Sequence, residues 1–154
     1  MASTTRHPEQ SELTLEVRRT FAAPRQRVFD AWTRAEELRR WFAPGPLTTA
    51  VADVDLRVGG RYRVTMRGPD GVEHTVTGVY QLIDPPKRLV YSWRWEDKPT
   101  AGESTVTVEF RDLGRSTEIV LRHEGLPNEK EIADHSHGWS GCLDKLEKAV
   151  RDGE

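Results

Sequence analysis

The residues that could perform acid–base chemistry in this chain fall on positions that the sequence pattern assigns to an apolar interior. His123 ends a segment in which alternate residues are apolar, and His135 lies one helical turn before Trp139. Two histidines at the mouth of one cavity could exchange protons near neutral pH. The pattern does not show whether the two rings meet, and hydrogen-bonded or solvent-facing histidines are the commoner alternative.

Arg19 is the charged residue whose position is most informative. It falls on the apolar side of an alternating segment, together with Leu15 and Val17. Because a buried guanidinium is costly without a partner, Arg19 must either be paired or reach water. We favour a structural pair with an internal carboxylate or a strand end in contact with water. The alternative is a polar anchor for an anionic ligand group.

The common metal motifs are absent from this sequence. His135 and His137 are two residues apart on an expected helix, so their side chains point about 160° apart, whereas helical metal pairs use positions i and i+4. Cys142 is the only cysteine, which excludes an intramolecular disulfide and a cysteine-rich zinc site. It lies on an apolar stripe and is most simply a small core residue.

Nucleophilic and nucleotide motifs are absent as well. Ser136 and Ser140 do not stand in a Gly-x-Ser-x-Gly elbow, and Gly59-Gly60 is too short for a phosphate-binding loop and does not open a helix. We therefore predict no metal, no cofactor and no catalytic residue.

The element that must position these side chains is a long helix over residues 128–150. At 1.5 Å per residue it spans about 35 Å, the width of a small domain. Asn128 can cap its first turn, with Glu131 three residues later. Its apolar wedge consists of Ile132, Trp139, Cys142, Leu143, Leu146 and Val150. Such a wide apolar face must lie across a sheet. The pattern does not explain Gly138 and Gly141, which are unfavourable inside a helix.

The rest of the chain alternates with period two, apart from two short helices. The helices are expected at 25–33 and 35–42, and the strands at 13–21, 48–56, 60–68, 73–83, 88–97, 103–112 and 115–124. Short turns between the strands indicate an antiparallel meander. On the inner face we expect Tyr62, Val64, Met66, Val76, Tyr80, Leu82, Leu89, Tyr91, Trp93, Trp95, Val106, Val108, Phe110, Thr117, Ile119, Leu121 and His123. Charged residues occupy the alternate positions, which predicts an α+β fold with one solvated sheet face.

Length and charge bound the remaining possibilities. We expect a tail over residues 1–11 and one domain over 12–152, as a monomer or homodimer. The formal charge of −2, from 23 basic and 25 acidic residues, argues against a general nucleic-acid-binding protein. No apolar run approaches the roughly 18 residues of a membrane span, and the first ten residues lack the apolar core of a signal peptide. A cytoplasmic location is the expectation.

Several short motifs occur together in a fixed order. They are Arg19-Thr-Phe-Ala-Ala-Pro24, Val28-Phe29-Asp-Ala-Trp32-Thr, Leu38, Trp41, Asp55-Leu-Arg57-Val-Gly59-Gly60, Gly71, Gly78, Pro85-Pro86, Leu89, Trp93-Arg94-Trp95 and Gly138-Trp139-Ser-Gly-Cys-Leu143-Asp-Lys-Leu146. With these motifs the chain resembles the heat-shock protein 90 ATPase activator homologue family. That family belongs to the START-like SRPBCC superfamily, which also contains polyketide cyclases and pollen allergens.

The resemblance implies a helix-grip fold, in which a curved seven-stranded antiparallel sheet wraps around the long C-terminal helix, with two short helices after the first strand. It also implies a deep apolar cavity between sheet and helix. The expected lining is Trp41, Tyr62, Val64, Met66, Tyr80, Trp93, Trp95, Phe110, His123, His135, Trp139 and Leu143, with Arg19 as a possible polar anchor. The alternative is that these side chains simply fill the core.

Three functions are compatible with this fold. The first is binding of a small hydrophobic or aromatic molecule, lipid-like or polyketide-like, in a cavity of at least about 300 Å³. The second is a cyclase-, aromatase- or hydrolase-like enzyme, which requires titratable groups beside the same cavity. The third is a protein-interaction module, such as a chaperone ATPase activator, with a closed cavity and an exposed apolar patch. Fold alone does not decide among these functions. We place binding ahead of catalysis.

Overall fold

The computed structural model describes residues 13–98 and 102–152, so the expected tail lies outside the described residues. Strands and helices alternate with the predicted spacing, and each boundary differs from the prediction by at most two residues. The elements are β1 (Thr14–Phe21), α2 (Arg25–Thr33), α3 (Ala35–Trp41), β2 (Thr48–Val54), β3 (Arg61–Arg67), β4 (Glu73–Asp84), β5 (Arg88–Trp95), β6 (Glu103–Asp112), β7 (Thr117–Glu124) and α4 (Glu129–Asp152).

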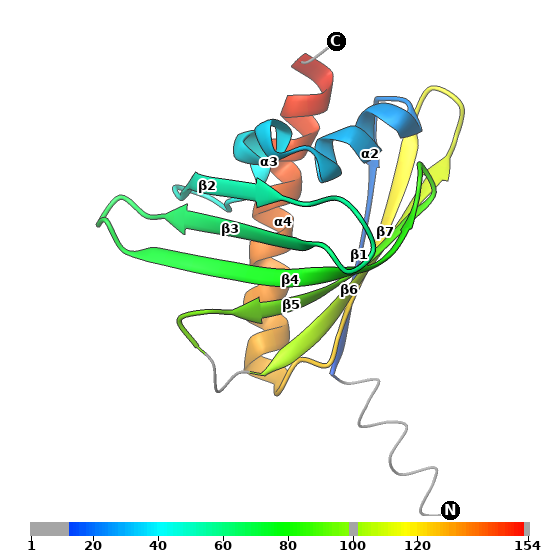
Figure 1. Cartoon of the computed structure of the whole chain (residues 1–154). Helices are drawn as coiled ribbons and strands as arrows, with labels where there is room; N and C mark the ends of the chain where they lie inside the picture. The colour runs from blue at the N-terminus through cyan, green and yellow to red at the C-terminus, as the bar shows by residue number, and fades with distance from the viewer. Residues whose placement is uncertain (1–12, 99–101, 153–154) are drawn as a thin grey trace, which may run out of the picture.

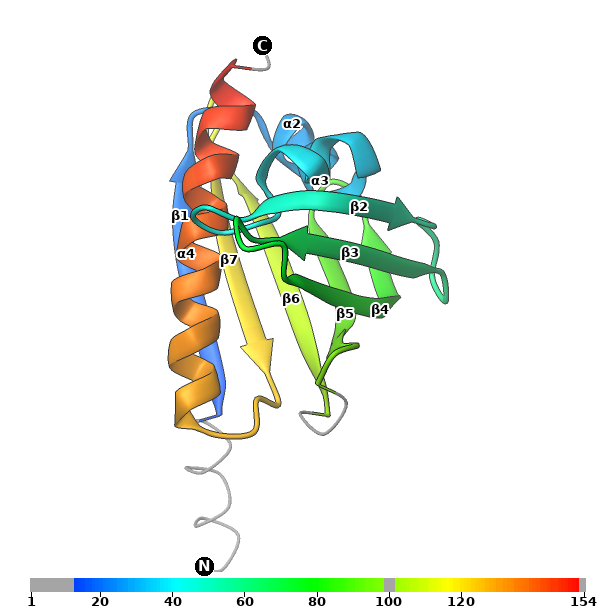
Figure 2. The same ribbon diagram turned by 90° about the vertical axis from the view of Figure 1, so that its left-hand side faces the viewer.

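The seven strands form one antiparallel sheet in the order β1-β7-β6-β5-β4-β3-β2. The sheet is strongly curved, and α4 lies along its concave side next to β1 and β7 (Figures 1 and 2). Helices α2 and α3 connect the two edge strands and cover the C-terminal half of α4. The predicted α+β helix-grip architecture is thereby confirmed.

The start of α4 follows from the predicted cap. The backbone N–H of Glu131 donates a hydrogen bond of 2.9 Å to Oδ1 of Asn128, which satisfies one of the free amides of the first turn. The apolar wedge then packs into the sheet, with Trp139, Leu143 and Leu146 almost fully buried. Burial of this face, rather than local propensity, supplies most of the stability of such a helix.

The inward position predicted for Leu82 was wrong. Leu82 is half-buried on the other side of β4, and Ile83 packs against the core instead. The pairing of β4 with β5 shifts between Tyr80 and Leu82. A β-bulge of this kind inserts one residue and exchanges the two faces of the strand beyond it.

Gly138 and Gly141 let the segment between α3 and β2 approach α4. A Cβ atom on Gly141 would lie 2.9 Å from Cβ of Pro44 and 3.4 Å from the backbone nitrogen of Gly45. A Cβ atom on Gly138 would meet only Cγ of Pro44, at 4.0 Å. Only Gly141 is therefore required for close packing, and this contact could not be read from the sequence.

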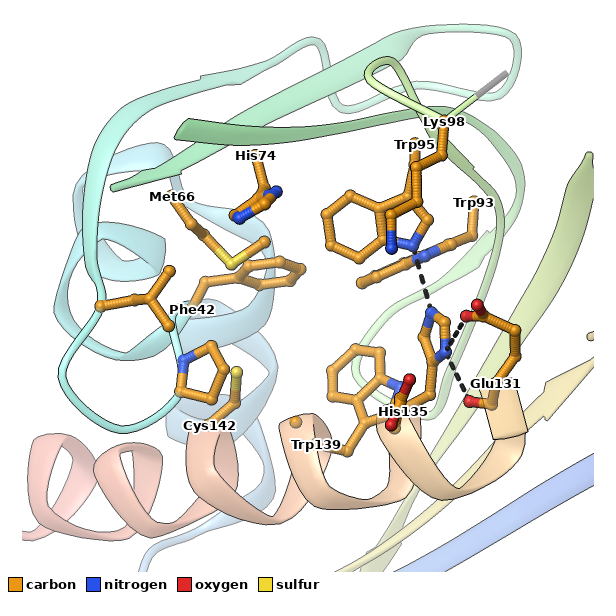
Figure 3. A pocket seen from close by; sticks show the side chains of 14 residues that line it. Phe42, Met66, His74, Trp93, Trp95, Lys98, Glu131, His135, Trp139 and Cys142 are labelled. Atoms are coloured by element: carbon orange, nitrogen blue, oxygen red, sulfur yellow. Dashed lines mark hydrogen bonds and ion pairs between the residues drawn. The ribbon is translucent and has the colours of Figure 1, made fainter. Parts of the chain in front are cut away.

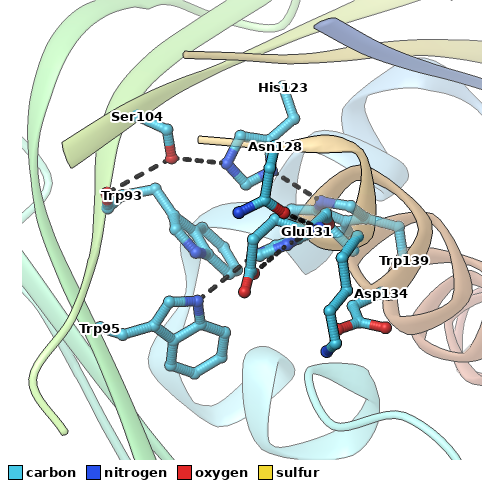
Figure 4. Close-up of polar contacts among 10 residues, drawn as sticks. Trp93, Trp95, Ser104, His123, Asn128, Glu131, Asp134 and Trp139 are labelled. Atoms are coloured by element: carbon cyan, nitrogen blue, oxygen red, sulfur yellow. Dashed lines mark hydrogen bonds and ion pairs between the residues drawn. The ribbon is translucent and has the colours of Figure 1, made fainter. Parts of the chain in front are cut away.

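A chain of buried hydrogen bonds joins α4 to the middle of the sheet (Figure 4). The indole N–H of Trp139 donates to Nδ1 of His123 at 3.2 Å, so Nε2 of His123 carries the proton and donates to Oγ of Ser104 at 2.7 Å. The Ser104 hydroxyl in turn faces the carbonyl of Trp93 at 3.5 Å. Since His123 is fully buried, desolvation and, to a smaller extent, His135 lower its pKa to about 3.

The two glycines of α4 give opposite predictions for alanine. We expect Gly138→Ala to raise the free energy of unfolding by up to about 1 kcal/mol, because alanine favours a helix and has room. Gly141→Ala should lower it by about 1–2 kcal/mol, because Pro44 and its backbone must move. Urea unfolding of both variants measures the difference. Equal effects would contradict the proposed contact.

His123 makes the stability of the fold depend on pH. Its folded pKa of about 3 lies below the unfolded value of about 6.5, so the unfolded state takes up protons first. The free energy of unfolding that this pKa difference contributes is fully present above about pH 6.5. It is about 2 kcal/mol smaller at pH 5 and falls further toward pH 3. Urea unfolding at pH 7 and pH 5 should show this loss in the native chain and not in His123→Gln.

The matched control is His137→Gln, because His137 lies on the exposed side of α4. This variant should keep the pH dependence of the native chain. If His123→Gln keeps it as well, His123 is not the group whose protonation destabilises the fold.

Candidate functional site

A pocket of about 210 Å³ lies between the N-terminal half of α4 and the sheet (Figure 3). Its wall is built from four segments: the connection after α3, the facing ends of β3 and β4, the end of β5, and one side of α4. The lining residues are Phe42, Pro44, Leu47, Met66, His74, Trp93, Trp95, Lys98, Glu131, Asp134, His135, Gly138, Trp139 and Cys142.

Four aromatic rings form most of the wall. The ring centroid of Trp93 lies 5.3 Å from that of Trp139, 5.5 Å from Trp95 and 5.9 Å from Phe42. Trp93 and Trp95 are alternate residues of β5 and therefore share the inner face of the sheet. Tilted and edge-on contacts at these distances are the arrangements that aromatic pairs prefer. The pocket is thus a rigid aromatic chamber rather than a loosely packed gap.

The segment between α3 and β2 closes one end of the chamber. Pro44 packs on Gly141, and the Lys145 ammonium donates to the carbonyl of Leu47 at 2.8 Å. These contacts hold Phe42, Pro44 and Leu47 against α4. A helix without glycine at position 141 would push this wall outward.

His135 lines the pocket with both ring nitrogens already engaged (Figure 3). The indole N–H of Trp95 donates to Nε2 of His135 at 3.2 Å. Nδ1 of His135 therefore carries the proton and donates to the carbonyl of Glu131 at 2.8 Å, with the Glu131 carboxylate at 3.5 Å. The imidazole orients Trp95 and has no nitrogen left for a ligand.

The rings of His123 and His135 do meet, with centroids 5.0 Å apart. However, His123 does not line the pocket, and its nitrogens bond Trp139 and Ser104. Neither ring presents a free nitrogen to the other or to a ligand. The pair is therefore structural and is not placed for acid–base catalysis.

Charged side chains surround the mouth of the pocket. On the sheet side, Nδ1 of His74 lies 3.0 Å from Oδ2 of Asp97, and Lys98 follows directly. On the helix side, Asp134 pairs with Lys130 at 2.9 Å. The mouth thus carries charges of both signs around an apolar interior.

An open groove of about 400 Å³ continues from the mouth over the β3–β4 turn. It shares Leu47 and His74 with the pocket, and its remaining lining is Gly68, Pro69, Asp70 and Val72.

Five of the predicted cavity residues line this pocket: Met66, Trp93, Trp95, His135 and Trp139. The others occupy the core. Tyr62, Val64 and Tyr80 surround a separate hollow of only about 10 Å³, and Trp41, Phe110, His123 and Leu143 are buried away from both. The prediction that these side chains point into the interior was correct. Which of them border empty space depends on what packs opposite each one.

The buried tyrosines are structural. The hydroxyl of Tyr62 donates to the carbonyl of Ser92 at 2.7 Å, and that of Tyr91 accepts from the indole N–H of Trp32 at 3.2 Å. Burial raises the pKa of Tyr62, Tyr80 and Tyr91. Neutral, buried phenols of this kind do not act as bases near neutral pH.

Arg19 does not line the pocket. Its guanidinium donates to Oδ1 of Asp144 at 2.8 Å and to the carbonyl of Ser140 at 3.4 Å, with Glu147 at 3.7 Å. Asp144 and Glu147 lie on the outer side of α4, with side chains 70% and 46% exposed. Arg19 therefore fastens the edge strand β1 to α4, and the structure does not bring it to the ligand site.

Sequence reasoning missed several lining residues. His74 had a readable signal, because it has the same parity as Val76 on β4. Lys98, Glu131 and Asp134 had none, since exposed positions around a turn and a helix end do not show which cavity they border. Cys142 was expected in the core, and its burial raises the pKa of its thiol to about 12. A thiol with this pKa is not a nucleophile near neutral pH.

Among the described residues, no group of three or more His, Cys, Asp or Glu side chains is placed to hold a metal ion. Within residues 13–98 and 102–152, no helix is long and apolar enough to cross a membrane.

The chain is similar to known proteins over most of its length. The family model described as "Activator of Hsp90 ATPase homolog 1-like protein" matches residues 22–151. The human and mouse activators of 90 kDa heat shock protein ATPase homolog 1 are each 29% identical over 111 residues. That region is 70% of this chain and 30% of each relative, so the chain spans about a third of their length.

Solved structures share the fold. A protein from Chromobacterium violaceum is 27% identical with a TM-score of 0.84, and the match covers 90% of this chain and 96% of that one. An AHSA1 protein from Silicibacter pomeroyi, at 24% identity, has a TM-score of 0.82 over 92% of this chain and 99% of that one. Together with the matching family model, these similarities show that the chain belongs to the Activator of Hsp90 ATPase homolog 1-like family and has its START-like fold.

Proposed function

We propose that this protein binds a small aromatic or hydrophobic molecule in the chamber between α4 and the sheet. The observation that carries the proposal is the pocket of about 210 Å³ walled by Phe42, Trp93, Trp95 and Trp139. Ligand sites are typically concave, mostly apolar and edged by a few polar groups. Rigid aromatic walls bind a flat ring at low entropic cost, because they are already ordered.

The volume limits the size of the ligand. It is below the roughly 300 Å³ that we expected of a deep cavity, because Trp41, Tyr62 and Phe110 fill the rest of the interior. An apolar cavity of about 150 Å³ can hold benzene. The chamber therefore suits one or two fused rings, and a lipid chain or a larger polyketide would have to extend into the adjoining groove.

The residues that the sequence offered for catalysis are not available at this site. The nitrogens of His123 and His135 are occupied, the tyrosines are buried and neutral, and the Cys142 thiol is protonated. General acid–base catalysis requires a group within reach of the substrate proton. Binding therefore remains the better supported function.

The protein-interaction alternative is suggested by the names of the human and mouse relatives. It calls for an exposed apolar patch. The exposed large apolar side chains among the described residues are Leu56, Val58, Val72 and Leu113. They lie on three different turns rather than along one face of a helix or strand. We therefore place ligand binding first.

Filling the chamber should abolish binding without weakening the fold. Gly138 lines the pocket, and a Cβ atom there has room. Gly138→Leu should therefore occupy the ligand space, and it exchanges glycine for a better helix former by about 0.8 kcal/mol. We expect the affinity for the neutral probe 2-naphthamide, measured by isothermal titration calorimetry, to fall at least tenfold while the melting temperature is kept or raised.

The matched control is Ala133→Leu, which adds a leucine at an exposed position of the same helix. Its affinity for 2-naphthamide should equal that of the native chain. Failure of the native chain to bind 2-naphthamide, or equal binding by Gly138→Leu, would overturn the proposal.

A further inference from the structure

We propose that the ligand is a small aromatic acid, whose ring lies between the tryptophans and whose carboxylate binds the Lys98 ammonium at the mouth, beside His74. This inference rests on the proposed function, because it specifies the ligand class of the same pocket. Three observations support it: the ammonium of Lys98, the open Nε2 of His74 beside it, and the ion pair that engages Asp134 on the opposite side.

Lys98 is a cation of the mouth that has no ion-pair partner among the described residues. It follows β5, and its side chain extends past Trp95 toward the chamber (Figure 3). The two lysines of α4 nearest the site are engaged, Lys130 with Asp134 and Lys145 with the carbonyl of Leu47. Within residues 13–98 and 102–152, the Lys98 ammonium has no hydrogen-bond or ion-pair partner. An ammonium beside an apolar chamber is suited to an anionic group on an otherwise apolar ligand.

His74 places a second polar group on the same side. Its Nδ1 faces the Asp97 carboxylate at 3.0 Å, and its Nε2 has no partner among the described residues. The imidazole lies on the sheet side of the pocket, as Lys98 does (Figure 3). Nε2 is therefore open to a polar group of the ligand.

The helix side of the mouth does not select a cation. Asp134 is paired with Lys130 at 2.9 Å, and the pKa of Asp134 is lowered, chiefly by this hydrogen bond and in smaller part by Lys98. Glu131 lies beside Nδ1 of His135, with its side chain 20% exposed. On the sheet side a cationic ligand would meet the Lys98 ammonium, and the Glu131 carboxylate opposite is largely buried against His135. Charge complementarity therefore favours an aromatic anion.

Three probes with the same ring test the charge preference. They are 2-naphthoate (anionic), 2-naphthamide (neutral) and naphthalen-2-ylmethanamine (cationic), titrated calorimetrically into the full chain at pH 7.5 and low salt. We expect 2-naphthoate to bind five- to tenfold tighter than 2-naphthamide, and the amine to bind weakest. Lys98→Gln should bring the naphthoate-to-naphthamide ratio close to one. The ratio is the readout, because both probes meet the same altered wall.

Lys148→Gln is the matched control, because it removes the same charge from an exposed position on the C-terminal half of α4. It should keep the preference of the native chain, and Lys98→Arg should keep it as well. If 2-naphthamide binds as tightly as 2-naphthoate, or if Lys98→Gln leaves the ratio unchanged, the inference is overturned and the binding function stands. Tighter binding of the amine identifies a cation site and also overturns it. If no probe binds, both proposals fail.

Discussion

The structure depends on burying one wide apolar face of α4 in the concave side of a curved sheet. The face contains tryptophan, whose indole N–H loses its water when it is buried and needs another acceptor. His123 is that acceptor. Its second nitrogen then needs a partner of its own, and it donates to Ser104. The helix is therefore fixed against β7 and β6 by a bond that holds at one position along its axis, whereas apolar contact alone would let it slide.

The chamber results from the uneven filling of this interface. Toward the C-terminus of α4, Leu146 and Val150 meet α2 and α3 and are fully buried. Toward the N-terminus, the helix presents Gly138 and the flat ring of Trp139 to a sheet that presents Trp93 and Trp95. Rigid aromatic edges cannot fill the space that branched aliphatic chains fill elsewhere, and a hollow remains. The pocket thus follows from which side chains face each other, with no change of fold.

The polar groups divide into two sets with different consequences. Those inside the interface, His123 and His135, have their nitrogens satisfied by tryptophans and neighbouring polar groups, which makes them part of the framework. Those at the mouth, Lys98 and Nε2 of His74, have no hydrogen-bond or ion-pair partner among the described residues. The two core histidines are thus poor guides to function here. Free capacity lies around the chamber, at its mouth and in the buried indole N–H of Trp93, which has no hydrogen-bond partner in the part of the chain that the structure describes.

The sequence by itself determined the elements, their order and most of the inward positions, because periodicity reports directly which face of a strand or helix is buried. Its failures have particular causes. Leu82 was misplaced because a β-bulge leaves no mark in an alternating pattern, and Gly141 was unexplained because its partner, Pro44, is nearly a hundred residues away. Periodicity places Tyr62 and Trp93 on the same face, yet only Trp93 borders the chamber. Only the tertiary structure decided that difference, because empty space depends on the side chain opposite each residue, and that side chain comes from a distant part of the chain.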